Sequence, residues 1–109
     1  MNQITPLLDV HTHTIASGHA FSTLQEMVDA AAEKNLQFLG ITEHAPGIEG
    51  TCTPIYFRNL HVVPRLIKGV HLLLGAELDI LDYNGTLDLD EGYYRKMDIR
   101  IAGIHSLCW

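Results

Sequence analysis

Four short apolar segments are separated along the chain by turns and by more polar stretches. They lie at residues 4–10, 38–42, 70–74 and 99–104, and the third runs on through Glu77. Continuous apolar runs of this length are typical of strands that are covered on both faces of a parallel sheet. The pattern therefore predicts four buried strands.

The first two connections between these strands predict helices. Apolar residues recur at helical spacing over residues 24–32, and Thr23 with Glu26 forms the sequence pattern of a capping box. A weaker helix is predicted near residues 57–68, and Pro64 inside the pattern indicates that it is short, kinked or starts late. Each of these helices would join one parallel strand to the next.

Two further features follow the third strand. Asn84-Gly85, between residues 80–82 and 86–89, is typical of a two-residue hairpin turn. Residues 91–97 predict one or two helical turns before the last strand. The alternation of strands and helices indicates an α/β fold with a parallel sheet and a β-hairpin excursion.

A side chain that can bind metal stands at the end of every predicted strand. The four are His13, His44, Glu77 and His105, at steps of 31, 33 and 28 residues. Each step is about one βα unit of roughly 30 residues. Because parallel strands present their carboxyl ends at one edge, where α/β proteins place their sites, we expect these four side chains to meet.

The first strand supplies more than one such side chain. His11 and His13 are two residues apart, so their imidazoles point to the same face and can share one ion. Asp9, one step deeper, is expected to orient a histidine, and His19 can reach the same edge from the following loop. Imidazole and carboxylate ligands suit zinc, manganese or iron, and a set without thiolate favours an open catalytic site.

Each of these residues also has an ordinary structural interpretation when it is taken alone. A single histidine near a strand end is usually a hydrogen-bonded structural residue, and Glu77 could form a surface ion pair. The agreement of four strand ends favours metal binding over a small α/β domain with incidental histidines. His61 and His71 lie outside the pattern, and Cys52 and Cys108 are expected to be bystanders, with Cys108 kept as an alternative ligand because it lies near His105.

The composition limits the classes of partner and compartment. Acidic residues outnumber Lys and Arg by 13 to 7, and the net charge of −6 argues against binding a nucleic-acid backbone. There is no signal-peptide pattern and no apolar run near the ~20 residues that a membrane span requires. Two cysteines without a CxxC motif fit a reduced compartment. We therefore expect a cytoplasmic protein without nucleic acid or membrane as partner.

Five segments carry these residues in order along the chain: 9–14 (DVHTHT), 16–23 (ASGHAFST), 41–44 (ITEH), 75–77 (GAE) and 103–105 (GIH). In this order and spacing they resemble the successive motifs of the PHP (polymerase and histidinol phosphatase) family. Within that family, the second segment resembles the first loop of the YcdX-like probable phosphatases. The resemblance covers nearly the whole chain.

The resemblance implies a distorted (βα)7 TIM-like barrel with up to three metal ions at its carboxyl-end rim, zinc or manganese with iron as a third option. The matching positions imply six ligands here: His11 and His13 on a first ion, Glu77 bridging the first and second, His105 on the second, and His19 with His44 on the third. Metal-activated water would then hydrolyse a small phosphorylated substrate without a side-chain nucleophile.

Two departures from the family's pattern change what is expected. Glu43 stands where the family usually has Asp, and because neighbours on a strand point to opposite faces, Glu43 is expected to support the ligands from outside the ligand set. The family also continues with another histidine and an Asp-x-His motif, which do not follow His105 here. We therefore expect residues 1–109 to be the N-terminal portion of one PHP domain, with an incomplete metal site.

Two functions remain open on this basis. The first is a metal-dependent phosphoesterase, and Arg58, Arg65 and Lys68 are the basic side chains that could meet a phosphate. The alternative is a non-catalytic metal-binding or assembly module that needs a second chain. That chain would be another copy, in a homo-oligomer, or a missing C-terminal half, because an unpaired edge and the apolar residues 107–109 need covering.

Overall fold

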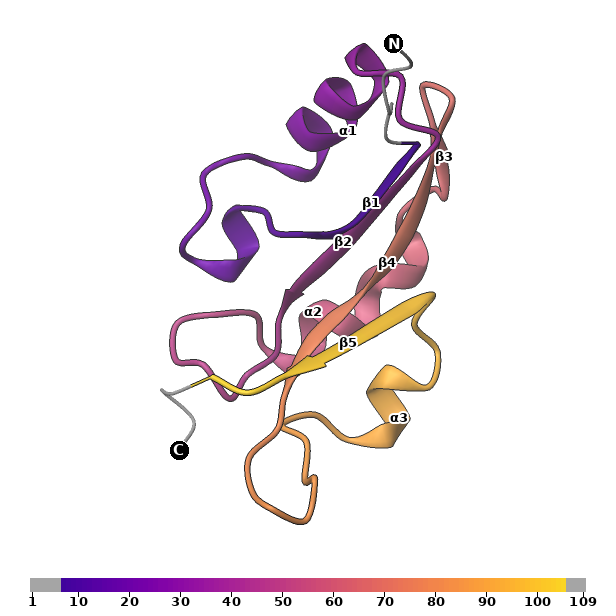
Figure 1. The fold of residues 1–109 in the computed structure, drawn as a ribbon. Helices are drawn as coiled ribbons and strands as arrows, with labels where there is room; N and C mark the ends of the chain where they lie inside the picture. The colour runs from indigo at the N-terminus through magenta and orange to yellow at the C-terminus, as the bar shows by residue number, and fades with distance from the viewer. Residues whose placement is uncertain (1–6, 106–109) are drawn as a thin grey trace, which may run out of the picture.

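The computed structural model describes residues 7–105, which form a curled half-barrel of mostly parallel strands with helices on its outer face (Figure 1). The strands are β1 (Leu8–Thr12), β2 (Phe38–His44), β3 (Leu66–Ile67), β4 (Val70–Asp79) and β5 (Ile99–Gly103). Their order is β1-β2-β4-β3, and β5 pairs with the second half of β4. Only β3 is antiparallel to its neighbour. The α/β fold with a parallel sheet is confirmed, and the curl is that of the first half of a TIM-like barrel.

The four predicted strands are present, with shifted ends. β1 lies further along the chain than the predicted residues 4–10, of which residues 4–6 are outside the described range. β2 and β4 both run past their apolar segments, because the parallel ladder continues until His44 lies opposite Glu77. Polar residues at these ends are therefore held in the sheet itself.

The first predicted helix, α1 (Leu24–Glu33), is confirmed. Its capping box is complete: the Thr23 hydroxyl accepts a hydrogen bond from the Glu26 N–H at 3.2 Å, and the Glu26 carboxylate accepts one from the Thr23 N–H at 2.9 Å. Just past the helix, Asn35 takes a left-handed φ of 61° and turns the chain toward β2.

Only a short part of the helix predicted over residues 57–68 forms, and it begins before that range. The chain instead forms α2 (Pro54–Arg58), the 3-10 helix η2 (Asn59–Val62) and then an extended segment that leads into β3. Pro64 explains the difference, because a proline disfavours the helical conformation of the residue before it. Val63 is accordingly extended, with φ −84° and ψ 126°.

The turn at Asn84 and Gly85 forms, but in the described chain only a single antiparallel bridge flanks it. The Asp82 carboxylate holds the turn by accepting a hydrogen bond from the Asn84 N–H at 2.9 Å. The helical turns predicted next reduce to one, α3 (Glu91–Tyr94). None of the helices in residues 7–105 has both the length and the apolar character needed to cross a membrane.

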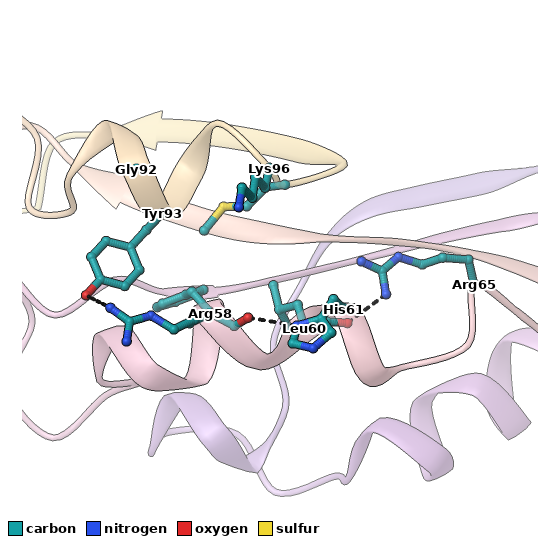
Figure 2. A pocket seen from close by; sticks show the side chains of 9 residues that line it. Arg58, Leu60, His61, Arg65, Gly92, Tyr93 and Lys96 are labelled. Atoms are coloured by element: carbon teal, nitrogen blue, oxygen red, sulfur yellow. Dashed lines mark hydrogen bonds between the residues drawn. The ribbon is translucent and has the colours of Figure 1, made fainter.

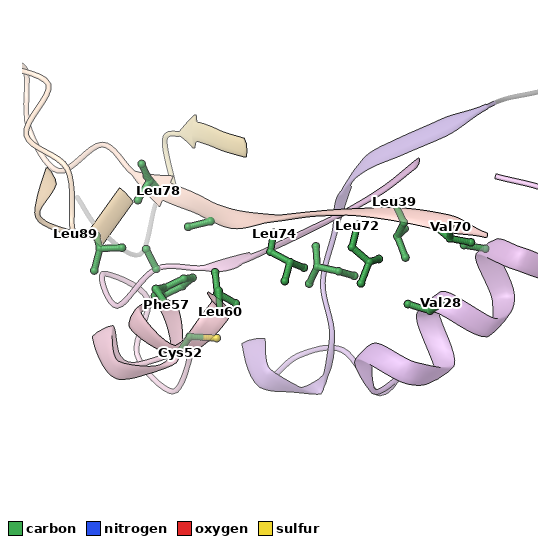
Figure 3. Close-up of a cluster of buried hydrophobic side chains, with 14 residues drawn as sticks. Val28, Leu39, Cys52, Phe57, Leu60, Val70, Leu72, Leu74, Leu78 and Leu89 are labelled. Atoms are coloured by element: carbon green, nitrogen blue, oxygen red, sulfur yellow. The ribbon is translucent and has the colours of Figure 1, made fainter. Parts of the chain in front are cut away.

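Alternation along β2 and β4 divides the sheet into an apolar outer face and a more polar inner face. On the outer face, Leu39 and Ile41 of β2 and Leu72 and Leu74 of β4 pack with Val28 of α1 (Figure 3). The same core continues beneath α2 and η2. The side chains at the intervening positions point to the inner face, and they include polar residues at the ends of both strands.

The first and last strands are less buried than the sequence predicts. Within the described residues, β1 and β5 each pair on one side, and their residues are half-buried or exposed. Leu8 is 54% exposed, and Ile104, directly after β5, is 68% exposed. The prediction of burial is therefore wrong for these two edge strands, although their apolar sequences suit strands with two neighbours.

Gly75 lets β5 approach β4 closely. A Cβ atom at this position would lie 1.7 Å from the Ile99 carbonyl oxygen, which belongs to the backbone and cannot move aside alone. Because β5 leads directly to His105, this close approach also sets where that histidine lies.

Candidate metal centre

The carboxyl ends of four strands meet around the carboxylate of Glu77. Its Oε1 atom lies 2.8 Å from Nε2 of His11, 3.1 Å from Nε2 of His13 and 3.6 Å from Nδ1 of His44. Its Oε2 atom lies 3.2 Å from Nε2 of His105. The structure therefore brings together the strand-end residues that the sequence spacing predicted to meet.

His19 joins these residues from the loop after β1. That loop contains the 3-10 helix η1 (Ile15–Ser17) and turns at Gly18, whose φ is 81°. The turn returns the His19 ring to the strand ends, where its centroid lies 5.0 Å from that of His13 and 4.9 Å from that of His44. All six residues named as ligands from the resemblance lie in this one cluster, which we call the Glu77 cluster.

The donor set of the Glu77 cluster fits metal ions. Three groups have ligand atoms that all lie within 4.8 Å of one another: His11, His13 and Glu77; His13, His19 and His44; and His44, Asp79 and His105. Nδ1 of His44 is buried and has no hydrogen-bond partner in the described chain. A buried nitrogen of this kind is costly unless something satisfies its lone pair, and a cation would do so.

Asp79 belongs to this cluster and was missed from the sequence. Its carboxylate contacts Nδ1 of His105, so that Nε2, on the other side of the ring, faces Glu77. Burial raises the pKa of Asp79, and Asp88 adds to this rise, while His105 opposes it. The signal was available, because Asp79 follows Glu77 at the same two-residue spacing that pairs the histidines of β1.

The histidines keep Glu77 ionised. Burial alone would raise the pKa of Glu77, but the hydrogen bond from His11 and the nearness of His44 and His13 outweigh burial and lower it. Burial also lowers the pKa of His13 and of His44, and the neighbouring histidines add to this effect. Carboxylates bind cations in the ionised form and imidazoles in the neutral form, so the lowered pKa of Glu77 and the lowered pKa values of His13 and His44 all favour cation binding.

Glu43 lies on the outer face of β2 and is fully buried. Its carboxylate accepts hydrogen bonds from the Ser17 hydroxyl and the Thr14 N–H, both at 2.8 Å, and from the Tyr56 hydroxyl at 3.2 Å. The Thr14 hydroxyl is a fourth donor. Ser17 also lies 3.3 Å from Nδ1 of His13, so Glu43 reaches the Glu77 cluster through a serine of segment 16–23 to which the sequence analysis gave no role.

Asp9 does not contact a histidine ring as the sequence reasoning expected. It is exposed, and its carboxylate accepts a hydrogen bond from the His11 backbone N–H at 3.3 Å. The β1–β2 register shifts between Asp9 and Thr12, so the regular alternation that the expectation assumed is interrupted between Asp9 and the histidines. Asp9 therefore acts on the backbone of a ligand strand.

The remaining histidines and cysteines lie elsewhere in the described chain. His61 contacts the Arg58 carbonyl oxygen through Nδ1 at 3.0 Å, and His71 stacks on Phe38. Cys52 is buried, and none of the three ligand groups found among residues 7–105 includes it. Cys108 lies outside the described residues, as do the rest of residues 106–109.

The basic side chains considered as phosphate contacts do not line the Glu77 cluster. Arg58 and Arg65 line a separate cavity of about 490 Å³ between α2, η2 and α3 (Figure 2). Arg58 donates a hydrogen bond to the Tyr93 hydroxyl at 2.8 Å, and Arg65 is paired with Asp98 at 2.6 Å. Lys68 lies at the opposite end of β4 and pairs with an acidic residue of α1. Their guanidinium and ammonium groups are thus already engaged within the fold.

The chain resembles known proteins along most of its length. The PHP domain matches residues 9–105. Proteins named probable phosphatase are 48% identical over 103 residues in Thermoanaerobacter sp., 46% over 101 residues in Caldicellulosiruptor saccharolyticus and 44% over 102 residues in Acetivibrio thermocellus.

These matches differ in how much of each protein they cover. They include 93–94% of this chain but 42% of each relative, so the chain spans less than half of the length of these relatives. The domain match, by contrast, includes every residue of the Glu77 cluster. The chain belongs to the PHP domain family.

Proposed function

We propose that the chain provides part of the active site of a metal-dependent phosphatase. The observation that carries the proposal is the convergence of His11, His13, His44 and His105 on the ionised carboxylate of Glu77. Membership of the PHP family and the names of the relatives support a phosphatase-type hydrolase. The metal dependence is supported by the donor set and by the unsatisfied nitrogen of His44.

The two oxygens of Glu77 face different ligands, which suits a bridging role. Oε1 faces His11 and His13, whereas Oε2 faces His105, so that one ion could lie on each side of the carboxylate. His19 and His44 would hold a further ion from the loop side. Zinc or manganese, with iron as a third option, would activate water and neutralise the oxygens of a phosphoryl group.

We further propose that the site takes a small phosphorylated molecule and is completed by ligands outside residues 1–109. Four strand ends form only an arc, and the relatives that share them are more than twice as long as the matched region. The net charge of −6 favours a small substrate over a nucleic acid. The two cysteines without a CxxC motif support a cytoplasmic location.

A second candidate is a non-catalytic metal-binding or assembly module. It is favoured by the exposed apolar residues beside the two edge strands, Leu8 on β1 and Ile104 after β5. A second copy that pairs with either edge would cover them. Sedimentation of the metal-loaded chain separates the two candidates, because a stable monomer contradicts the assembly module.

Metal content per chain tests the proposed function. The protein is purified without chelator or affinity tag, and zinc, manganese and iron are measured by elemental analysis. We expect bound metal in the natural sequence and loss of most of it in the double variant His11→Ala, His13→Ala, because both imidazoles face Glu77. The matched control is His61→Ala, His71→Ala, which removes two histidines outside the cluster.

The outcomes of this experiment are distinct. Equal metal content in both double variants contradicts a site at Glu77. Metal that is bound at the cluster, but without phosphate release from a phosphomonoester by the full-length protein loaded with zinc or manganese, favours the non-catalytic module.

A further inference from the structure

We infer that Ser17 is a positioning residue that fixes the tautomer of His13, with the proton on Nδ1, and thereby directs the Nε2 lone pair toward Glu77. The inference rests on the proposed metal site and deepens it, because it names the group that prepares one ligand. Ser17 belongs to η1, and only 2% of it is exposed.

The Ser17 hydroxyl has three polar neighbours. Its oxygen lies 2.8 Å from Oε1 of Glu43, 3.0 Å from the backbone nitrogen of His44 and 3.3 Å from Nδ1 of His13. A serine hydroxyl can donate one hydrogen bond and accept two. Three neighbours therefore use its full capacity, provided that exactly one of them is an acceptor.

Glu43 is the acceptor. Its carboxylate is buried in the apolar outer layer of the sheet and is surrounded by four donors: the Thr14 N–H, the Thr14 hydroxyl, the Ser17 hydroxyl and the Tyr56 hydroxyl. Because four donors point at its two oxygens, both oxygens act as acceptors. The single hydrogen of Ser17 therefore points to Glu43.

The proton on His13 follows from this direction. The His44 N–H is a donor, so Ser17 has one lone pair left for Nδ1 of His13, and that nitrogen must carry a hydrogen. In the reverse arrangement Ser17 would donate to His13. Its oxygen would then face the Glu43 carboxylate at 2.8 Å with no hydrogen between them, which is repulsive.

The tautomer determines what Nε2 of His13 can do. With the proton on Nδ1, Nε2 presents a lone pair 3.1 Å from the carboxylate oxygen of Glu77. Two facing lone pairs repel each other, and a cation that binds both makes the contact favourable. Glu43 thus acts through Ser17 to hold the proton of His13 on Nδ1. Asp79 acts on Nδ1 of His105 in the same way, but by direct contact.

Nitrogen NMR of the full-length chain labelled with 15N-histidine tests the inference without metal. The Nδ1 and Nε2 shifts of each ring distinguish the two neutral tautomers, and His13→Gln identifies the signals of His13. We expect the natural sequence to show a protonated Nδ1 and an unprotonated Nε2 at His13. Ser17→Ala should remove this preference and weaken zinc binding, measured by competition with a chelator, about 10- to 100-fold.

Tyr56→Phe is the matched control. It removes one hydroxyl donor from the same carboxylate, but from Oε2, whereas Ser17 donates to Oε1. The tautomer of His13 should therefore be unchanged. A similar loss of the tautomer preference in both variants would indicate a general loosening of the fold and overturn the role assigned to Ser17.

The measurement on the natural sequence is decisive even if Ser17→Ala does not fold. A proton on Nε2 of His13, or an equal mixture of tautomers, overturns the inference. A protonated Nδ1 in a chain that binds no zinc supports the inference and counts against the proposed metal function alone, so the two failures are distinguishable.

Discussion

Two buried glutamates one strand apart show how the same side chain is used in opposite ways. Glu43 lies in the outer layer of the sheet among hydroxyl and backbone donors, each of which has its own hydrogen to give. Glu77 lies on the inner face among imidazole nitrogens. A hydroxyl or amide group donates a hydrogen bond to a carboxylate and needs no further partner. A neutral imidazole can instead direct a lone pair toward the carboxylate, and a cation can then bind both groups.

The difference concerns what each site needs to be complete. Around Glu43 the chain itself supplies four hydrogen-bond donors, so both carboxyl oxygens are satisfied within the fold. Around Glu77 the chain gathers lone pairs and leaves Nδ1 of His44 without a hydrogen-bond partner among the described residues. The Glu43 environment is therefore expected to serve stability, and the Glu77 environment to serve binding.

Alanine substitution of each glutamate should give the largest difference in unfolding free energy between the two environments. Glu43→Ala leaves the Ser17 and Tyr56 hydroxyls and the Thr14 N–H without their acceptor, at about 1–3 kcal/mol for each buried group. We expect the metal-free chain to lose at least about 3 kcal/mol of unfolding free energy. Glu77→Ala removes no acceptor from a buried hydroxyl or amide and should cost less than half as much. Urea denaturation monitored by circular dichroism measures both.

Equal losses in the two variants would contradict the division of roles. The matched substitution at the two positions removes the same atoms, so the size of the side chain cannot explain a difference. Metal content on the same samples should show the reverse order, with the loss at Glu77→Ala.

Zinc should stabilise the chain only where the Glu77 cluster is intact. Ligand that binds the folded state alone at 100 times its dissociation constant adds about 2.7 kcal/mol to the unfolding free energy. We expect a zinc-dependent rise in melting temperature for the natural sequence, which a chelator reverses, and none for Glu77→Ala. A similar rise in both would place the metal elsewhere.

Alkaline pH should lower the unfolding free energy through the groups buried near Glu43. Burial, and then the charge of Glu43, raise the pKa of Cys52 to about 12, and the same causes raise the pKa of Tyr56. Above about pH 9 the unfolded chain releases protons that the folded chain keeps, so the unfolding free energy falls as pH rises. Each group contributes up to about 1.4 kcal/mol per pH unit.

Denaturation at several pH values between about 8 and 11 measures this dependence. Cys52→Ala should flatten the curve near pH 9, because it removes the thiol that titrates first in the unfolded chain. A stability that is constant or rises over this range would contradict the burial-driven pKa shifts.

The sequence predicted the Glu77 cluster better than it predicted the Glu43 environment, for a physical reason. Parallel strands bring their ends to one edge, so spacing alone was enough to assemble His13, His44, Glu77 and His105. Ser17 reaches Glu43 and His13 only through the fold of η1, which no periodic pattern encodes. Its role depends on hydrogen-bond directions that residue identities do not show.

The fold was predictable where the pattern is local or repeated. The capping box of α1 lies within four residues and was found directly. Around Pro64, which was expected to shorten or kink the helix, the range given to the helix was still too long. Burial of β1 and β5 was overestimated because an apolar strand sequence does not state how many neighbours the strand has.

Removal of the α1 cap should give the smallest loss of unfolding free energy and serve as a reference for the other variants. Thr23→Ala abolishes the hydroxyl that accepts from the Glu26 N–H and should cost about 1 kcal/mol of unfolding free energy, whereas Thr23→Ser should cost little. The hydrogen bonds of the Thr23 side chain go to Glu26 and to neither Glu43 nor Glu77, so the stabilisation that zinc adds should be the same in Thr23→Ala as in the natural sequence. Weaker zinc binding in Thr23→Ala would mean that zinc binding follows the stability of the whole fold. The loss of metal in Glu77→Ala would then need no metal site at Glu77, and the proposed contrast between the two glutamates would be wrong.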